Sequence, residues 1–273
     1  MAHGSNHDEL AGAAILRPGQ QLNGVYEIDA LLARGGMGEV YRGHAIQTGD
    51  PVAIKVIRAD LAENELALAL FRSEASKLHR LHHEAIIRYF LFSVDPAVGR
   101  AYLAMEFVEG EPLSQALRRG PLPPAEVRRL AIRLAGGLGA AHRRDIVHRD
   151  VSPDNVILQR GDVDEAKIID FGIARSTEAG TTLIDVGFAG KLNYVSPEQV
   201  GLYGGEVGPR SDIYSLGLVL AEALRGEALD MGGTQVEMIE KRQRLPDLSG
   251  VDARLRPALD AMLRPDPADR LQT

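Results

Sequence analysis

The residue pattern of this chain changes once, from short strands to long helices, and this change limits its fold more than any other feature. From about Leu22 to Val108 the sequence has short runs of β-branched and aromatic residues separated by turn residues, a pattern typical of strands. One segment, Asn64 to Leu81, interrupts them with apolar residues at helical spacing. After Glu109 the apolar residues follow long helical stretches instead. The chain is therefore predicted to form a small β-rich unit and a larger helical unit, with a cleft between them.

The expected elements divide the chain into two lobes. The strands with the clearest pattern are Val25 to Ile28, Glu39 to Arg42, Val52 to Ile57 and Ala101 to Met105. The long helices of the second unit are Pro124 to Arg143, Tyr214 to Leu224 and Leu255 to Leu263. We predict an α+β fold with a flexible extension at residues 1–20, an N-terminal lobe at residues 21–108 and a C-terminal lobe at residues 109–273. Because the chain stops just after Arg270, we interpret the C-terminal lobe as truncated from a longer protein.

The composition excludes several classes of protein. The chain has no cysteine, which rules out a disulfide framework, a cysteine nucleophile and a thiolate metal site. Its net charge of −7 argues against a general surface for nucleic acid or an anionic membrane. No stretch approaches the roughly 18 apolar residues that a membrane span needs. We expect a cytoplasmic segment, a monomer or weak homodimer, without nucleic-acid or membrane contacts.

A glycine-rich run, Ala33 to Val40, lies between two of the predicted strands. Gly35, Gly36 and Gly38 would let backbone N–H groups approach phosphate oxygens without obstruction by side chains. Taken alone, a run of this kind is more often a simple hairpin turn than a phosphate site. It is not a Walker A loop, because no Gly-Lys-Ser/Thr follows, and it is not a Rossmann fingerprint, because the next element is a strand.

A lysine and a glutamate on successive elements form the next candidate pair. Lys55 lies in an otherwise apolar strand, where an inward-pointing ammonium group needs an anionic partner to offset its desolvation. Glu74 lies on an otherwise apolar face of the following helix and would supply the carboxylate. The alternative is a lysine at the end of a strand that reaches solvent.

Two polar segments, each next to a short apolar strand, carry the strongest chemical signal. They are His148 to Asn155 and Asp170-Phe171-Gly172. Asp150 would orient a hydroxyl group and accept its proton, while Asn155 and Asp170 would bind a metal ion. Carboxylate and amide oxygens together with substrate phosphates are the ligands that Mg²⁺ prefers. Any one of these residues alone would suggest only a turn or a cap, but their joint order favours a catalytic site.

Together, these motifs resemble the protein-kinase signature, and the run from Gly35 to Val40 is similar to that of bacterial eukaryotic-like (Hanks-type) Ser/Thr protein kinases. The resemblance extends from about Leu22 to the end of the chain. It implies a bilobal kinase fold that transfers the γ-phosphoryl group of ATP to Ser/Thr hydroxyls of protein substrates. It also implies Mg²⁺ as the metal ion, with Mn²⁺ as an alternative.

The resemblance implies a role for each site residue. Lys55 would hold the α- and β-phosphates while it pairs with Glu74, and Asp150 would be the catalytic base. Met105 would be the gatekeeper before a hinge that reads the adenine edge. The residues of the implied nucleotide site are Ala33, Gly35, Gly36, Gly38, Val40, Ala53, Lys55, Glu74, Met105, Glu106, Val108 and Ile157. Those of the implied metal site are Asn155 and Asp170.

The same resemblance implies a supporting framework. The residues that match the stacked spine between the lobes are Leu78, Tyr89, His148 and Phe171. Asp212 would anchor this spine. Ser196-Pro197-Glu198 would close the activation segment, and Arg270 would be the buried partner of Glu198.

Three residues depart from the family pattern. Ala33 occupies the first glycine position, where we expect a modest effect on nucleotide affinity. Ser152 stands where Ser/Thr kinases usually carry a lysine, so the catalytic loop lacks a cation near the γ-phosphate. Lys191 replaces a threonine in the activation segment, and our hypothesis is that it supplies the missing cation. The alternative is a solvated lysine on a loop.

The departures leave two other functions open. A pseudokinase or scaffold would bind nucleotide with little transfer, as Ser152 and Ala33 would suggest. A small-molecule phosphotransferase shares the fold but lacks the full activation segment that ends in Ser196-Pro197-Glu198.

Arg149 is the type of residue that pairs with a loop phosphate, so we predict autophosphorylation at Thr181 or Thr182.

Overall fold

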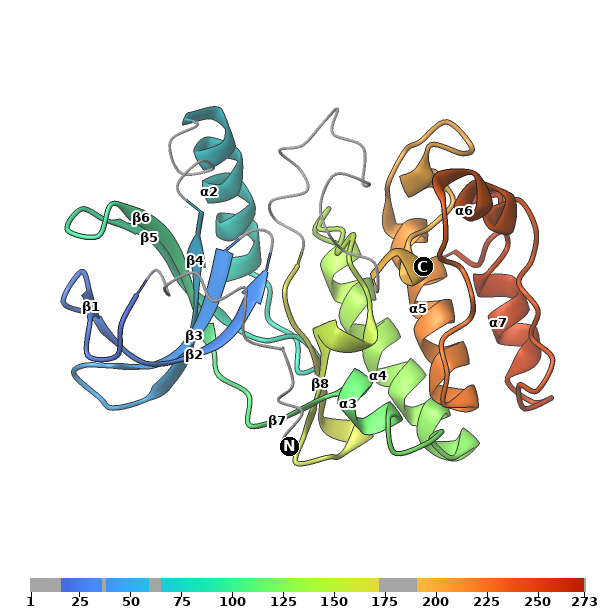
Figure 1. The fold of residues 1–273 in the computed structure, drawn as a ribbon, viewed down its shortest axis with the longest axis horizontal. Coiled ribbons are helices and arrows are strands. Elements are labelled where there is room, and N and C mark those ends of the chain that lie inside the picture. The colour runs from blue at the N-terminus through green and yellow to red at the C-terminus, as the bar shows by residue number, and fades with distance from the viewer. Residues whose placement is uncertain (1–15, 36–37, 59–64, 172–190, 273) are drawn as a thin grey trace, which may run out of the picture.

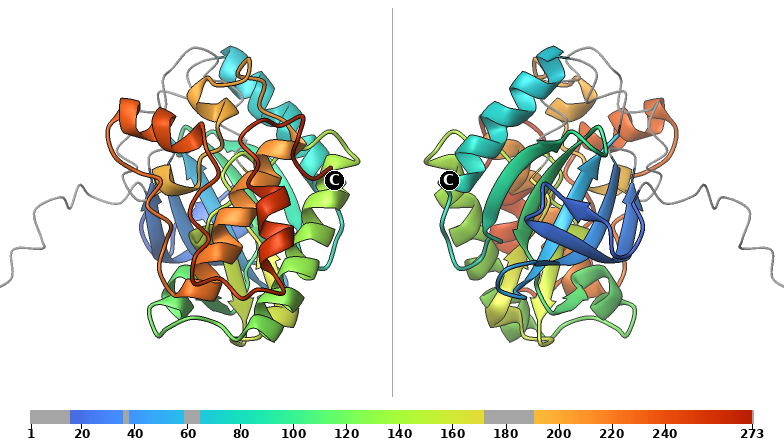
Figure 2. Two further views of the ribbon diagram at one scale, coloured as in Figure 1. Left: turned by 90° about the vertical axis from the view of Figure 1, so that its right-hand side faces the viewer. Right: turned by 90° about the vertical axis from the view of Figure 1, so that its left-hand side faces the viewer.

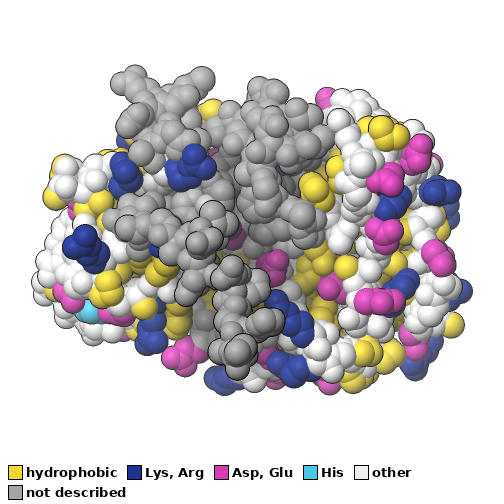
Figure 3. All heavy atoms as spheres, viewed as in Figure 1, with side chains coloured by type: hydrophobic (Ala, Val, Ile, Leu, Met, Phe, Trp, Pro, Cys, Tyr) yellow, Lys and Arg dark blue, Asp and Glu magenta, His cyan; other side chains and the backbone are white. Residues whose placement is uncertain are grey.

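The computed structural model describes residues 16–35, 38–58, 65–171 and 191–272. The chain forms two lobes (Figure 1). One is a β-sheet with one long helix, and the other is a mainly helical unit built around α4 (Pro124–His142), α5 (Pro209–Arg225) and α7 (Arg256–Met262). This arrangement confirms the predicted α+β bilobal fold. Acidic and basic side chains are interspersed on the face of the helical lobe seen in Figure 3. No helix in the described part of the chain is long and apolar enough to cross a membrane.

The N-terminal lobe is an antiparallel sheet with the strand order β1-β2-β3-β4-β6-β5. Its strands are β1 (Gln21–Leu22), β2 (Tyr26–Gly35), β3 (Gly38–Ala45), β4 (Pro51–Ile57), β5 (Tyr89–Asp95) and β6 (Arg100–Glu106). Helix α2 (Glu65–His79) lies beside this sheet, as the right-hand view of Figure 2 shows. β5 was not among the predicted strands.

The two faces of this sheet have separate cores, which follows from the period of two along each strand. Val40 lies opposite Lys55, and Ala53 lies opposite Met105, so these four side chains share one face. Ala53 and Met105 belong to the large core that continues into the C-terminal lobe. Ile54, which lies between Ala53 and Lys55 in the sequence, belongs to a smaller core on the outer face. The strand register therefore places the predicted nucleotide-site residues together on the face toward the second lobe.

The segment before β1 differs from the prediction of a flexible extension up to residue 20. Leu16 is only 1% exposed and belongs to the outer core, and its backbone N–H donates to the Tyr41 hydroxyl at 2.9 Å. The Gly19 N–H donates to the Ile28 carbonyl at 2.8 Å, and the Ile28 N–H donates to the Gln20 carbonyl at 3.0 Å. The outer face of the sheet is apolar and needs a cover, and residues 16–22 provide it. Residues 1–15 lie outside the described part of the chain.

The C-terminal lobe contains a small antiparallel sheet of order β7-β8-β9 and a helical core. Its strands are β7 (Gly110–Pro112), β8 (Val156–Gln159) and β9 (Ala166–Ile168). Its α-helices are α3 (Leu113–Leu117), α4 (Pro124–His142), α5 (Pro209–Arg225), α6 (Gln235–Arg242) and α7 (Arg256–Met262). The short 3₁₀ helices are η1 (Pro153–Asn155), η2 (Val163–Glu165), η4 (Lys191–Tyr194) and η5 (Glu198–Val200).

Helix α5 is the central helix of this lobe. Eleven successive residues, from Ser211 to Ala221, are buried. The helix begins with Pro209 in its first turn, where the missing N–H of proline costs nothing, and ends at Gly226 in the left-handed region (φ 79°). It starts earlier than predicted because its first turn, which includes Asp212, is polar and buried. That polar first turn supports the candidate site.

Candidate active site

The loop between α4 and β8 fixes the orientation of Asp150. The Asn155 side-chain Nδ2 donates to the Asp150 carbonyl at 2.7 Å and to its Oδ2 at 3.1 Å. The Asp150 N–H donates to His148 Nδ1 at 3.2 Å. Pro153 starts the 3₁₀ turn that brings Asn155 back toward Asp150. The structure therefore brings the predicted base and one predicted metal ligand into direct contact.

Asp212 holds the backbone that leads into this loop. Its Oδ2 accepts from the His148 N–H and lies 2.8 Å from His142 Nε2, while its Oδ1 accepts from the Arg149 N–H at 2.8 Å. Arg149 is left-handed (φ 64°), a conformation that costs a non-glycine residue about 1–3 kcal/mol. The hydrogen bonds that two successive N–H groups donate to the buried Asp212 carboxylate offset this cost. Asp212 thus serves as the anchor that the resemblance implied.

Phe171 and Asp170 connect the second motif to both lobes. The Phe171 ring packs on His148 with 4.5 Å between centroids, and its N–H donates to the Tyr89 hydroxyl at 3.4 Å. Burial raises the pKa of Tyr89, so this hydroxyl stays protonated. Leu78 is fully buried in the same core. The four residues of the implied spine therefore come from both lobes and pack in one core.

The predicted ion pair between Lys55 and Glu74 is wrong for this structure. Lys55 Nζ pairs with Asp170 Oδ1 instead, and Glu74 lies 3.7 Å from the ammonium of Lys77, one helical turn away. Lys55 is 12% exposed and Glu74 is 24% exposed. Asp170 is left-handed (φ 56°) and presents its carboxylate to the lysine. The ammonium group of Lys55 is therefore paired with a carboxylate, as predicted, but this carboxylate belongs to Asp170 of the second motif.

The hinge carries a charged contact that sequence reasoning missed. Glu106 Oε1 pairs with Lys167 of β9, and Glu106 Oε2 accepts from the Arg88 N–H at 3.0 Å. The pair joins the end of β6 in the first lobe to β9 in the second. Its signal in the sequence was Lys167, a cation within an apolar strand, as Lys55 is. Beyond Glu106 the hinge continues through Phe107, whose ring lies 5.1 Å from the Arg42 guanidinium.

The apolar residues predicted to line the nucleotide site come mainly from four strands, β3, β4, β6 and β8. Val40 packs against the large core, and Ala53 and Met105 are buried in it. Ile157 lies on β8 opposite Pro112 of β7, and it is partly exposed. Val108 also packs against the core. The predicted nucleotide-site residues therefore line a surface shared by the two lobes.

The glycine run forms the β2–β3 hairpin. Ala33 lies in β2 opposite Val40, and Gly35 lies opposite Gly38. Ala33 has no positive φ, which satisfies the condition under which alanine replaces glycine there. Gly38 has φ +143°, and a Cβ built on it would lie 1.9 Å from the Val56 carbonyl oxygen. Gly36 lies outside the described residues.

Gly38→Ala should therefore weaken both the fold and nucleotide binding. The backbone strain and the clash should cost about 1–3 kcal/mol or more, because the contacted atom is a backbone oxygen. Gly35→Ala is the matched control for stability, since its added Cβ would meet nothing closer than the Gly38 oxygen at 4.0 Å. Urea denaturation and ATP titration of both variants test this. Equal stability of the two variants would contradict the requirement for glycine at position 38.

The residues of the implied metal site fit a site completed by phosphate. Asn155 uses Nδ2 for Asp150, which leaves its Oδ1 oxygen for a ligand, and Asp170 supplies a carboxylate. The described residues contain no group of three His, Cys, Asp or Glu side chains that could hold a metal ion. Mg²⁺ is often bound by one or two protein oxygens together with substrate phosphates.

The residues that depart from the family pattern take different places. Ser152 is 1% exposed, and its hydroxyl has no hydrogen-bond partner among the described residues. The Ser152 side chain is therefore a buried part of the catalytic loop. Lys191 begins η4, but its side chain lies outside the description, and so do Thr181 and Thr182. The hypotheses of a relocated cation and of autophosphorylation stay predictions.

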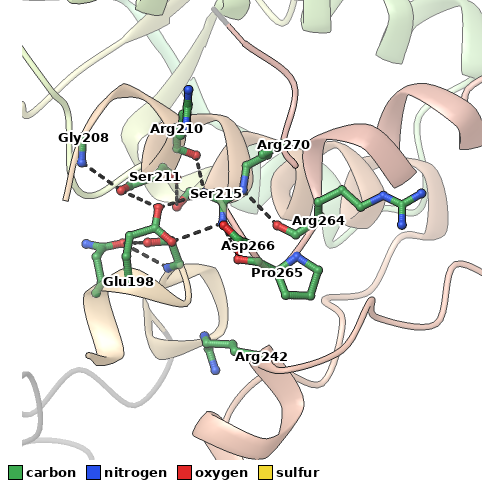
Figure 4. Close-up of polar contacts among 12 residues, drawn as sticks. Glu198, Gly208, Arg210, Ser211, Ser215, Arg242, Arg264, Pro265, Asp266 and Arg270 are labelled. Atoms are coloured by element: carbon green, nitrogen blue, oxygen red, sulfur yellow. Dashed lines mark hydrogen bonds and ion pairs between the residues drawn. The ribbon is translucent and has the colours of Figure 1, made fainter. Parts of the chain in front are cut away.

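The predicted partners Glu198 and Arg270 form a buried ion pair (Figure 4). Their atoms meet at 2.8 Å (Nη1 to Oε1) and 3.2 Å (Nη2 to Oε2). Ser211 Oγ donates to Glu198 Oε1 at 2.7 Å. The Arg270 guanidinium also donates to the carbonyls of Arg210, Arg264 and Pro265. This pair ties the end of the activation segment to the C-terminal end of the described chain.

Comparison with known proteins agrees with this geometry. The family model of the protein kinase domain matches residues 26–273. The serine/threonine-protein kinase PknL of Mycobacterium bovis is 36% identical over 257 residues, which are 91% of this chain and 63% of PknL. The serine/threonine-protein kinase pkn2 of Myxococcus xanthus is 40% identical over 209 residues, covering 75% of this chain and 25% of pkn2. A crystal structure of the Mycobacterium tuberculosis PknI kinase domain matches with a TM-score of 0.73 and 28% identity over 94% of both chains.

The chain therefore belongs to the protein kinase domain family. It resembles the Hanks-type kinases of bacteria, as the motifs predicted. The chain spans about 63% of the length of PknL. Protein kinases in general use ATP and a divalent metal ion.

Proposed function

We propose that this domain transfers the γ-phosphoryl group of ATP to Ser or Thr hydroxyls of protein substrates, with Mg²⁺ as the metal ion. The observation that carries the proposal is the meeting of both motifs at the cleft: Asn155 orients Asp150, and Lys55 pairs with Asp170. The names of PknL and pkn2 as serine/threonine-protein kinases support the choice of acceptor.

Each of these residues has one task in the proposed reaction. Asp150 accepts the proton of the acceptor hydroxyl, since its carboxylate is held by the Asn155 amide. Lys55 binds phosphate oxygens of the nucleotide with its ammonium group. Asn155 and Asp170 would hold Mg²⁺, which neutralises the charge that develops on the transferred group. Ala53 and Met105 would provide an apolar wall for the nucleotide, since both are buried in the core that the two lobes share.

Phosphoamino-acid analysis after incubation with radiolabelled ATP and MgCl₂ tests the proposal. We expect phosphoserine or phosphothreonine in an added protein acceptor or in the chain itself. Nucleotide binding without transfer would favour a pseudokinase. Transfer only to hydroxylated metabolites would favour a small-molecule phosphotransferase, and phosphotyrosine would overturn the choice of acceptor.

A further inference from the structure

Arg242, in the last turn of α6, is a fully buried arginine bound by backbone carbonyls alone. Its Nε donates to the Val195 carbonyl at 2.7 Å, and its Nη2 donates to the Leu192 carbonyl at 2.6 Å. Its Nη1 donates to the carbonyls of Met231 at 2.7 Å and Met238 at 3.1 Å. No carboxylate forms an ion pair with it in the described part of the chain. Figure 4 shows Arg242 apart from the contacts between Glu198 and Arg270.

Burying a cation of this kind costs free energy of desolvation. The geometry of the hydrogen bonds that Arg242 donates therefore matters more than its charge. Burial lowers the pKa of the Arg242 guanidinium, which reflects the loss of hydration. Four carbonyl oxygens satisfy its donors, and they come from three separate places: residues 192–195, the loop before α6, and α6 itself. Because the guanidinium is planar and rigid, these donors fix the distance between the three segments. We call residues 192–195 the strip.

The strip contacts α5 as well as α6. The Tyr194 hydroxyl donates to Glu222 of α5. Just after it, the Ser196 N–H donates to Gln199 Oε1 at 3.0 Å, and Gln199 Nε2 donates to the Arg149 carbonyl at 2.9 Å. The strip is thus linked to the residue that precedes Asp150.

This position relates the strip to the acceptor protein. An acceptor hydroxyl has to reach Asp150, so the peptide that carries it runs along a segment that flanks the catalytic loop. ATP instead contacts the glycine hairpin and the hinge, on the other side of the cleft. A change in the strip should therefore alter acceptor binding more than nucleotide binding.

We propose that Arg242 is a positioning residue that holds the strip in the conformation that receives the protein substrate. It acts through Leu192 and Val195 and touches neither ATP nor the acceptor hydroxyl. The inference rests on the proposed function, because it specifies how that same site binds its acceptor. The neighbouring loop adds to the constraint: a Cβ on Gly232 would lie 2.8 Å from Asn193 Oδ1, so this loop packs closely on the strip.

Steady-state kinetics with Arg242→Met and Arg242→Lys test the role. Arg242→Met removes all four donated bonds, and we expect the KM for a protein acceptor to rise about tenfold or more, with the KM for ATP within about twofold. Arg242→Lys keeps the cation but has only a compact ammonium group, so its acceptor KM should lie between those of wild type and Arg242→Met. Arg244→Met and Arg244→Lys are matched controls on an exposed arginine nearby and should change neither constant.

Two outcomes would overturn the inference. One is an acceptor KM unchanged in Arg242→Lys and Arg242→Met, and the other is an equal rise in both KM values. If Arg242→Met does not fold, Arg242→Lys decides: we expect a several-fold rise in acceptor KM and faster amide exchange over residues 192–195. Failure of the proposed function would look different, because the wild-type chain itself would then phosphorylate no protein.

Discussion

Asp150→Asn should lower the rate of phosphoryl transfer by roughly 10²–10⁴-fold, the range that a general base usually supplies. The asparagine side chain has the same shape and still accepts from Asn155, but it cannot take the proton of the acceptor hydroxyl. ATP affinity should change little, because Lys55 and the glycine hairpin lie across the cleft from this loop. Initial rates with a protein acceptor and calorimetric titration with ATP measure the two effects.

Asp154→Asn is the control for this variant. Asp154 belongs to the same loop, but it is exposed and accepts from the Ser114 hydroxyl at 2.5 Å. Its loss should leave the rate within a few-fold of wild type. If Asp150→Asn is no slower than Asp154→Asn, Asp150 is not the base.

Arg270→Met should destabilise the fold by about 3–5 kcal/mol, the cost of breaking a buried ion pair. Both side chains are almost fully buried, so Glu198 would remain as a buried carboxylate without its cation. The carbonyls of Arg210, Arg264 and Pro265 would lose their donors as well. The shift of the urea denaturation midpoint at constant m-value measures the loss.

An exposed ion pair provides the comparison. Arg254 pairs with Asp252 at 2.9 Å, but its side chain is 81% exposed. Arg254→Met should therefore leave the urea denaturation midpoint almost unchanged, because solvent screens an exposed pair. A similar loss in both variants would mean that burial does not control the strength of the Glu198 pair.

The sequence was sufficient to predict which residues share the cleft, but not every pairing within it. Alternation along β4 and β6 puts Ala53, Lys55 and Met105 on one face, whatever the detailed packing. The partner of Lys55 depends on where α2 lies relative to the sheet, and local pattern does not contain that information. Glu74 and Asp170 were both suitable carboxylates, and only the three-dimensional structure distinguishes them.

Among the elements that were not predicted, β5 and α6 were missed for identifiable reasons. β5 (Tyr89–Asp95) lacks regular alternation because its register shifts between Tyr89 and Leu91, so Phe90 and Leu91 are both exposed. α6 buries only Met238 and Arg242, which gives it little apolar periodicity. Its start did carry a signal, the capping box formed by Thr234 and Glu237.

The role of Arg242 was the hardest feature to foresee. It lies in a run of charged and polar residues, Glu240 to Arg244, that reads as a solvated helix face. Its partners are backbone carbonyls, which leave no trace in the identity of the residues that bear them. A contact of this type can be found only in a structure.

The burial of Leu16 bears on where a fragment of this protein can be cut. The match to the kinase family begins at residue 26, so a fragment designed from that match alone would omit both Leu16 and Leu22. The Tyr41 hydroxyl would lose the Leu16 N–H, and the outer core of the sheet would be opened to water. Fragments made for crystallisation or assays should therefore start before Leu16, so that the sheet beneath the glycine hairpin keeps its cover.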